Sequence, residues 1–200
     1  IADLLNNNNA SAKGLETMNF DVIIIGAGPG GIFAAYELMQ CRPELRVAIF
    51  EAGHELSKRH CPIDGKKITS CIGCRTCAIM NGFGGAGAFS DGKYNITNQF
   101  GGTLHEYIGK KEAIELMEYV DRINLEHGGE GTKLYSTANS EFKKLCMQND
   151  LHLLDASVRH LGTDINYIVL ENLYNDLKNK ADFYFDTPVE SVSLVEGGYE

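Results

Sequence analysis

The first clear hydrophobic pattern is an unbroken apolar run at residues 22–25, which reads Val-Ile-Ile-Ile. A continuous run of β-branched residues is typical of a parallel strand that is covered on both faces. Residues 32–40 then predict a helix, and a second apolar run at residues 46–50 predicts another strand. The order strand, helix, strand predicts the βαβ unit of an α/β fold with a central parallel sheet.

Helical patterns predominate in the middle of the chain. Residues 110–127 place apolar side chains close to helical spacing, and residues 141–148 give a second, shorter helical pattern. We interpret residues 93–150 as a mostly helical insertion into the α/β domain.

A further strand and helix are predicted after this insertion. Residues 151–154 favour a strand, and residues 165–178 favour a helix that Thr163 or Asp164 would cap. Two interpretations stay open for Arg159 and His160 just before this helix. They contact a substrate or phosphate, or they belong to a solvated loop.

The two ends of the chain differ from its centre. Residues 183–185 and 189–195 predict strands, and residues 196–200 predict a hairpin turn that opens a further strand. Because that strand has no room to finish, we expect the chain to stop inside a larger protein. Residues 1–17 contain four consecutive asparagines and lack an apolar period, which predicts a linker or a non-native extension.

Composition narrows the function classes. The formal net charge is -9 and the sequence pI is about 5.1, so a nucleic-acid partner is not expected. The apolar runs are too short for a membrane span, and the N-terminus lacks the pattern of a secretory signal. We therefore expect a cytoplasmic protein whose six cysteines do not form a disulfide framework. The expected partner is a small-molecule substrate or an electron donor.

The most informative chemistry lies directly after the first predicted strand. Gly26, Gly28 and Gly31 occupy the three glycine positions of a G-x-G-x-x-G turn, with Pro29 and Gly30 between them. The first glycine permits a tight turn, the second lets the backbone approach a pyrophosphate, and the third allows close packing of helix on strand. The helix N-terminus then presents free N–H groups and a positive dipole end to the anion.

Glu51 completes this dinucleotide pattern. It ends the second apolar run twenty positions after Gly31, where a carboxylate accepts hydrogen bonds from the adenosine ribose, and Ala52 follows it. A carboxylate repels a 2′-phosphate, which argues against an NADP-type ligand at this site. FAD and NAD remain as the predicted ligands.

Four cysteines precede a second glycine-rich segment. Cys71, Cys74 and Cys77 form C-x2-C-x2-C, and Cys61 lies ten positions before Cys71. Three interpretations stay open. The four thiols bind a [4Fe–4S] cluster or zinc, Cys74 and Cys77 form a redox pair beside a flavin, or the thiols are ordinary.

The glycines that follow do not favour a helix or a strand, because glycine costs conformational entropy in either. They indicate a backbone close to something flat or anionic, with nearby polar groups for a phosphate or a flavin edge; the alternative is a flexible connector. The residues concerned are Gly82, Gly84, Gly85, Gly87, Ser90, Asp91 and Lys93.

With these residues in view, the chain resembles the FAD-dependent oxidoreductases of the glutathione-reductase-like flavoprotein superfamily, which have two dinucleotide-binding domains. The resemblance rests on DVIIIGAGPGG at residues 21–31, on IFE ending at Glu51, and on FYFDTPVESV at residues 183–192. A narrower resemblance, to a poorly characterised bacterial group of FAD-dependent dehydrogenases, rests on residues 71–93 and on RHLGTD at residues 159–164.

The resemblance covers about residues 19–195 and implies a discontinuous, Rossmann-like FAD-binding domain. Residues 18–92 and 151–200 would form it, with a β-meander or hairpin near the C-terminus. Val189 would meet the adenine through its backbone, and the loop with Gly84, Gly85 and Ser90 would line the flavin side.

The resemblance also implies an activity. The chain would be part of a flavin-dependent enzyme that transfers hydride or electrons, with NAD(P)H as an expected electron donor. Members of the superfamily have a further glycine and aspartate segment and a substrate-binding domain, and this chain contains neither. Two rival hypotheses are an NAD-binding dehydrogenase domain and a cysteine-based metal-binding or redox-sensing module with a structural nucleotide.

Overall fold

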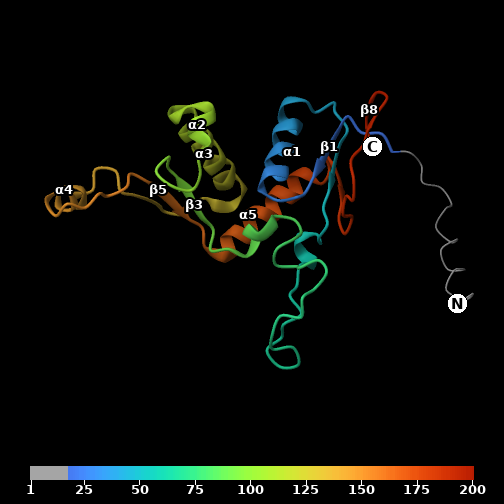
Figure 1. Ribbon diagram of the computed structural model, residues 1–200, viewed down its shortest axis with the longest axis horizontal. Coiled ribbons are helices and arrows are strands. Elements are labelled where there is room, and N and C mark those ends of the chain that lie inside the picture. The colour runs from blue at the N-terminus through green and yellow to red at the C-terminus, as the bar shows by residue number, and fades with distance from the viewer. Residues whose placement is uncertain (1–17) are drawn as a thin grey trace, which may run out of the picture.

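A computed structural model describes residues 18–200, so the predicted linker at residues 1–17 lies outside the described residues. The first sheet contains β1 (Val22–Ile25), β2 (Val47–Phe50) and β6 (Asp182–Tyr184) in the order β1-β2-β6. All its neighbouring strands are parallel, and Ile25 lies opposite Phe50 in the register. Helix α1 (Pro29–Cys41) connects β1 to β2 (Figure 1). The predicted α/β class with a parallel sheet is therefore confirmed.

A second, antiparallel sheet lies beside the first. It contains β3 (Lys93–Ile96), β4 (Leu134–Ser136) and β5 (Ser157–His160) in the order β3-β5-β4. Tyr94 and Leu134 lie opposite Arg159 on either side of the central strand β5. The segment after residue 150 thus gives β5 to this sheet and β6 to the parallel one.

The remaining helices connect and cover the two sheets. The expected helix at residues 110–127 is α3, which continues into a π-helical turn that is kinked at His127 and Gly128. Among the described residues, no helix combines the length and apolar character needed to cross a membrane. The helices and helical turns other than α1 are α2 (Leu104–Ile108), α3 (Lys110–Asn124), the π-helical turn η4 (Leu125–Gly129), α4 (Glu141–Gln148), α5 (Gly162–Leu177), and the 3₁₀ turns η2 (Leu56–Lys58) and η3 (Gly85–Phe89).

The core forms where α1 and α5 meet the parallel sheet. Ile32 of α1, Ile49 of β2 and Leu173 of α5 are all buried in it. Phe83 is fully buried there and packs against the ring of Tyr174, with a centroid separation of 5.1 Å. Helix α5 also contacts η3 and η4, so it joins the second glycine segment to the helical part of the chain.

The prediction that β1 is covered on both faces is wrong. This strand lies at the edge of the sheet, and its side chains alternate between a covered and an open face. Ile23 and Ile25 are 48% and 58% exposed, because α1 covers only the other face. They line a groove of about 740 Å³ together with Val189 and Val192.

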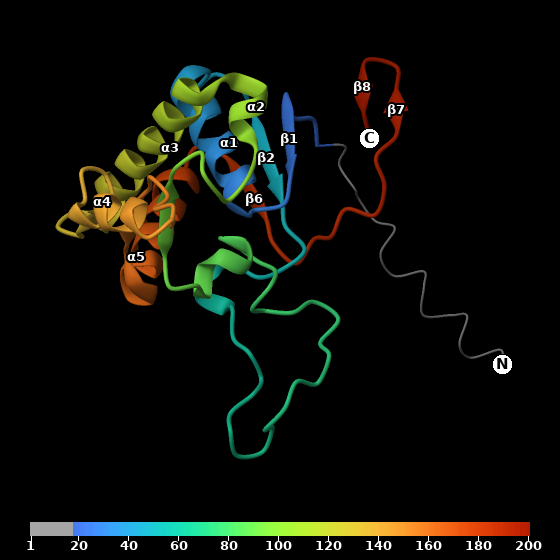
Figure 2. The same cartoon turned by 60° about the vertical axis from the view of Figure 1, so that its left-hand side comes forward.

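The predicted C-terminal hairpin is confirmed, in shorter form. Strand β7 (Leu194–Val195) pairs with β8 (Gly198–Tyr199), and the turn between them contains Gly197 with φ of 91°. The strand predicted over residues 189–195 forms only at its last two positions, because pairing with β8 begins there. Figure 2 shows this hairpin standing apart from the parallel sheet.

Two predicted boundaries in the last third of the chain are wrong. Residues 151–154 run as irregular backbone, and the strand forms later, at β5, where β3 and β4 supply pairing partners. Helix α5 begins at Gly162 with Leu161 in the N-cap position. Thr163 and Asp164 thus lie inside the first turn, where the Asp164 carboxylate complements the helix dipole.

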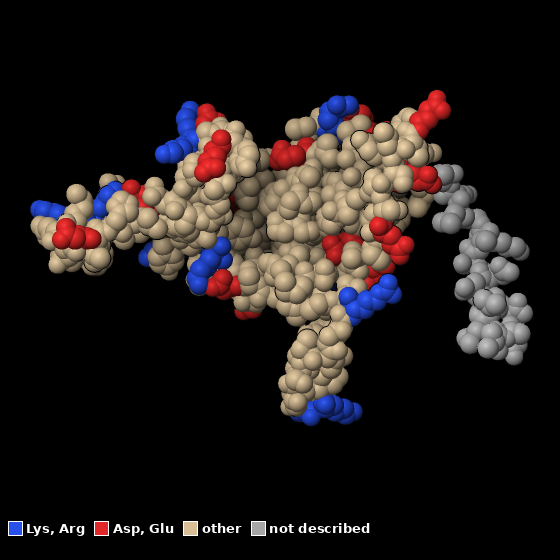
Figure 3. Space-filling model, in the orientation of Figure 1, with Lys and Arg blue, Asp and Glu red and all other residues tan. Residues whose placement is uncertain are grey.

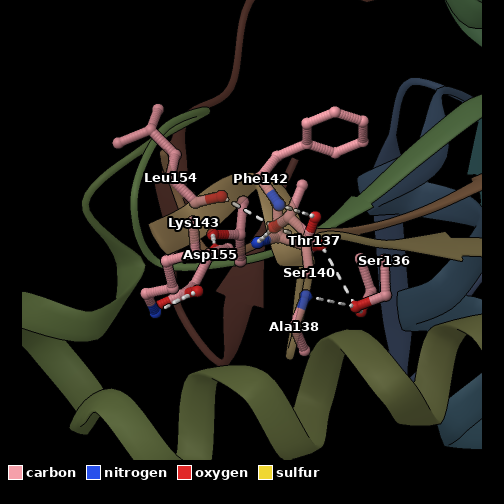
Figure 4. A network of polar contacts seen from close by, with 11 residues as sticks. Ser136, Thr137, Ala138, Ser140, Phe142, Lys143, Leu154 and Asp155 are labelled. Carbon is pink, nitrogen blue, oxygen red and sulfur yellow. Dashed lines mark hydrogen bonds and ion pairs between the residues drawn. The ribbon is translucent and has the colours of Figure 1, made fainter. Parts of the chain in front are cut away.

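Helix α4 lies on an arm that projects from the second sheet (Figure 1). A polar network at its base joins the two sides of the arm (Figure 4). Thr137 Oγ1 donates to the carbonyl of Leu154 over 2.7 Å and accepts from the N–H of Ala156 over 2.9 Å. Lys143 Nζ lies 2.8 Å from the carboxylate oxygens of Asp155, which connects α4 to the irregular segment that leads into β5.

Candidate functional site

The turn between β1 and α1 exposes a helix N-terminus. Gly26 has φ of 96°, a conformation that a residue with a side chain adopts only with strain. Gly28 is the N-cap of α1 and Pro29 follows it, and among the described residues no side chain caps this end. The amide groups of Gly30 and Gly31 therefore have no partner inside the helix, and they lie at the positive end of its dipole.

The glycines of this turn have different surroundings. A Cβ on Gly31 would lie 1.9 Å from the carbonyl oxygen of Gly26, so only glycine allows α1 to pack this closely on β1. A Cβ on Gly28 or Gly30 would meet no described atom within 4 Å. The space in front of the helix N-terminus is thus open, as the approach of an anionic group requires.

Glu51 is only 7% exposed, and its carboxylate joins three glycine-bearing segments. Oε2 accepts a hydrogen bond from the N–H of Ala27 over 2.7 Å. Oε1 accepts from the N–H groups of Gly53 and Gly82 over 2.8 Å and 2.9 Å. A carboxylate has about four acceptor positions, so one remains for a ribose hydroxyl. Half-buried Ala52 follows on the same turn.

The second glycine segment packs directly on the first. The N–H of Gly84 donates to the carbonyl of Ala27 over 2.8 Å, and a Cβ on Gly85 would lie 3.3 Å from Cα of Gly28. A Cβ on Gly84 would lie 2.8 Å from Cδ1 of Leu170 in α5. Close backbone packing therefore accounts for these glycines, and the segment forms one wall beside the α1 N-terminus.

Polar side chains lie exposed just after this wall. Ser90 Oγ donates to the carbonyl of Gly87 over 2.8 Å. Asp91 and Lys93 form an ion pair, and the hydrogen bond from Lys93 lowers the pKa of the Asp91 carboxyl. The groups predicted to meet a flavin edge are thus gathered at one place, with local partners of their own.

The segment that carries Val189 is anchored to Glu51. The N–H of Glu51 donates to the carbonyl of Tyr184, and the N–H of Thr187 donates to the carbonyl of Glu51, both over 2.9 Å. Val189 follows two positions later and lines the groove beside β1. The structure therefore brings the predicted pyrophosphate, ribose and adenine positions to one end of the parallel sheet.

The predicted metal site receives no support. Cys61, Cys71 and Cys74 are exposed and Cys77 is half-buried, and all are free thiols. Among the described residues, no three His, Cys, Asp or Glu side chains are grouped to hold a metal ion. The reason is the shape of this segment, which runs out and back as a long open loop (Figure 2).

Neither interpretation of Arg159 agrees with the structure. Arg159 lies in β5, is buried, and forms a bidentate ion pair with Asp121 of α3 over 2.6 Å and 2.7 Å. The side chain thus holds α3 to the second sheet. His160, the next residue, is exposed.

Arg59 is a site residue that the sequence pattern did not reveal. It is buried and lies between the exposed residues Lys58 and His60 in a stretch without periodicity. The sequence gives no signal for its role, because all three side-chain hydrogen bonds go to backbone carbonyls about twenty positions away.

Comparison with protein families shows a match to the Thi4 family over residues 7–57. Over 33 residues the chain is 61% identical to a thiamine thiazole synthase of Yarrowia lipolytica, which is 16% of this chain and 10% of that protein. The chain is thus similar to these proteins over a short stretch, and the family match includes β1, α1 and β2.

Two solved structures have a partly similar chain path. Glycine oxidase from Geobacillus kaustophilus aligns with a TM-score of 0.46 and 17% identity, over 90% of this chain and 50% of that one. L-amino acid deaminase from Proteus myxofaciens, solved in complex with anthranilate, aligns with a TM-score of 0.38 and 14% identity, over 94% and 42%. The chain spans at most half the length of these proteins, and likeness at this level assigns neither an activity nor a substrate.

Proposed function

We propose that this chain is the FAD-binding part of a flavin-dependent oxidoreductase that transfers hydride or electrons. One observation carries the proposal. The uncapped N-terminus of α1 opens beside Gly28 and Gly30, and the buried carboxylate of Glu51 is fixed next to it. A positive helix end and a ribose acceptor at this separation along the chain suit an adenine dinucleotide.

The residues that would hold the pyrophosphate lie in the first turn of α1. The N–H groups of Gly30 and Gly31 would donate to phosphate oxygens, and Gly28 leaves room for the ligand because it has no side chain. Pro29 at the first helical position offers no N–H of its own but pre-sets the helical backbone.

The ribose and adenine would lie toward the end of β2. Glu51 would use its remaining acceptor position for a ribose hydroxyl, with Ala52 beside it. The backbone at Val189 would meet the adenine, since hydrogen bonds from Glu51 to Tyr184 and from Thr187 to Glu51 hold that segment beside the ribose position.

The second glycine segment favours FAD over NAD as the ligand. Its packing on Ala27 and Gly28 extends the site beyond the pyrophosphate turn, toward Ser90. NAD binding at the turn alone would not require this second wall. When bound, the flavin would supply the hydride or electron transfer, and the chain would position it and exclude water.

The Thi4 match favours a second candidate, a unit related to the thiamine thiazole synthases. The matched residues include the strand, turn and helix that form the pyrophosphate position. The match therefore falls on the turn that we propose binds the dinucleotide, and it does not distinguish FAD from NAD.

An absorbance spectrum of the purified protein tests the proposal, followed by titration with each dinucleotide. We expect a flavin spectrum, or quenching of FAD fluorescence on titration into protein purified without ligand. A colourless protein that binds NAD but not FAD in calorimetry would contradict it in favour of the NAD-binding alternatives. A protein that binds neither would contradict both.

A further inference from the structure

Arg59 closes the base of the cysteine-bearing segment, defined here as residues 60–76. Arg59 is 2% exposed, and all three nitrogens of its guanidinium donate to backbone carbonyls. Nε donates to Ala78 over 2.9 Å, Nη2 to Ile79 over 2.8 Å, and Nη1 to Phe83 over 2.6 Å. One side chain at the start of the segment therefore fixes the backbone at its end.

The same guanidinium reaches the second glycine segment. It lies 4.8 Å from the ring centroid of Phe89, at the end of η3. A Cβ on Gly82 would lie 2.7 Å from Cδ of Arg59 and 2.5 Å from the carbonyl oxygen of His54, so glycine is required where the arginine passes.

Arg59 and Glu51 form hydrogen bonds with the backbone of two adjacent residues. Glu51 accepts from the N–H of Gly82, and Arg59 donates to the carbonyl of the next residue, Phe83. Burial lowers the pKa of the Arg59 guanidinium, and the nearby charges of Glu51 and Cys77 oppose this effect. The nucleotide site and the cysteine-bearing segment are thus connected through two residues of backbone.

The cysteine-bearing segment has few other attachments. Its residues are exposed almost without exception, and its local order comes from a turn in which Asp64 accepts from the N–H groups of Lys66, Lys67 and Ile68. Figures 2 and 3 show it projecting from the body of the molecule. Opening of the segment at its base therefore requires that the hydrogen bonds of Arg59 break.

We propose that Arg59 is a positioning residue that couples nucleotide binding to closure of the cysteine-bearing segment. The inference rests on the proposed nucleotide site. A ligand bound to Glu51 and to the α1 N-terminus stabilises the arrangement in which Glu51 and Arg59 form hydrogen bonds with Gly82 and Phe83. It therefore raises the free energy needed to open the segment at Arg59. By thermodynamic reciprocity, loss of the Arg59 hydrogen bonds weakens nucleotide binding by the same factor by which the nucleotide stabilises the closed segment.

Hydrogen exchange of peptides covering residues 77–85 tests this coupling, with and without FAD, in the wild type and in Arg59→Lys. Lysine keeps the charge but lacks the planar fork that reaches three carbonyls. In the wild type, FAD at about 100 times its Kd should slow exchange there by about tenfold or more, within the limit set by mass action. In Arg59→Lys, exchange should be faster and FAD should slow it less than about twofold, with FAD affinity weakened.

Arg159→Lys is the matched control. Arg159 is also buried and also donates to a backbone carbonyl, but it lies in the second sheet. This variant should lose stability while leaving exchange of residues 77–85 and their response to FAD unchanged. An equal change in both variants would overturn the proposal, since a general loss of stability would then explain it.

Alkylation of Cys77 gives a second readout. Half-buried Cys77 should be alkylated more slowly than exposed Cys61, and FAD should slow the alkylation of Cys77 but not that of Cys61. Equal protection by FAD in Arg59→Lys and the wild type, or protection of neither Cys77 nor residues 77–85, would overturn the coupling. If FAD does not bind the wild type, the proposed function fails. Hydrogen exchange of residues 77–85 without ligand then still tests whether the Arg59 hydrogen bonds hold this segment, because it should be faster in Arg59→Lys than in the wild type.

Discussion

The carboxylate of Glu51 accepts a hydrogen bond from the backbone N–H of Ala27 over 2.7 Å, 24 positions earlier in the chain. This bond ties the end of β2 to the turn that follows β1. The other carboxylate oxygen accepts hydrogen bonds from the backbone N–H groups of Gly53 and Gly82. A single buried side chain therefore sets the spacing between the helix N-terminus and the second glycine segment.

Replacing Glu51 by glutamine should weaken both stability and nucleotide binding. The amide NH₂ would face backbone N–H groups, leaving at least one buried donor without a partner at a cost of about 1–3 kcal/mol. Urea unfolding measures the stability, and FAD titration should show an affinity at least about tenfold lower. Glu44→Gln, at an exposed carboxylate that pairs with Arg42, is the control and should change neither. Unchanged FAD affinity in Glu51→Gln would refute the ribose role.

Two glycines of the same turn should respond differently to alanine. In Gly31→Ala the new Cβ would lie 1.9 Å from a backbone oxygen, so we expect loss of folding or a large fall in melting temperature. In Gly28→Ala the Cβ meets open space and φ is -76°, so the melting temperature should stay close to that of the wild type. FAD affinity should nevertheless fall at least about tenfold, because the methyl group would occupy the approach of the pyrophosphate. Full FAD binding by Gly28→Ala would place the ligand elsewhere.

Local features of the fold were predictable from the sequence. The strand, turn, helix and strand around Gly26 and Glu51 follow from periodicity and from glycine spacing, which act over a few residues at a time. The C-terminal hairpin follows from the Gly-Gly turn at residues 197–198. These features depend on backbone sterics and short-range pairing, so a single sequence contains enough information to predict them.

Features that depend on distant partners were not predictable. The edge position of β1 is decided by which strands pair with it, and its apolar run reads the same at a centre or an edge. The buried state of Arg159 depends on Asp121, which lies 38 positions earlier. Arg59 depends on carbonyl groups, which every residue has, so no residue type marks its partners. The open loop of Cys61 to Cys77 likewise shows that spacing alone does not bring thiols together.

Removal of the Asp121 carboxylate should destabilise the protein without changing the nucleotide site. Asp121→Ala leaves the buried guanidinium of Arg159 without its charge partner, which typically costs about 3–5 kcal/mol. Asp155→Ala removes an exposed pair with Lys143 and should cost less than about 1 kcal/mol. Urea unfolding of both variants measures the difference, and FAD affinity per folded molecule should match the wild type in each. An equal loss in the free energy of unfolding in the two variants would contradict the burial of the Asp121–Arg159 pair.

Tyr119 should make stability depend on alkaline pH. Its hydroxyl donates to Oε1 of Glu37 in α1 over 2.6 Å, and this hydrogen bond raises the pKa of Tyr119 from 10.0 to about 12. Because the folded state binds this proton more tightly than the unfolded state, the stabilisation is fully present below pH 10 and is lost as the pH rises toward 12. The stability difference between the wild type and Tyr119→Phe should therefore shrink over that interval. Ultraviolet titration of the phenolates should lose its step near pH 12 in this variant, while Tyr107→Phe, at an exposed tyrosine, should keep it. A wild-type titration without that step would show that the Tyr119–Glu37 bond does not form in solution.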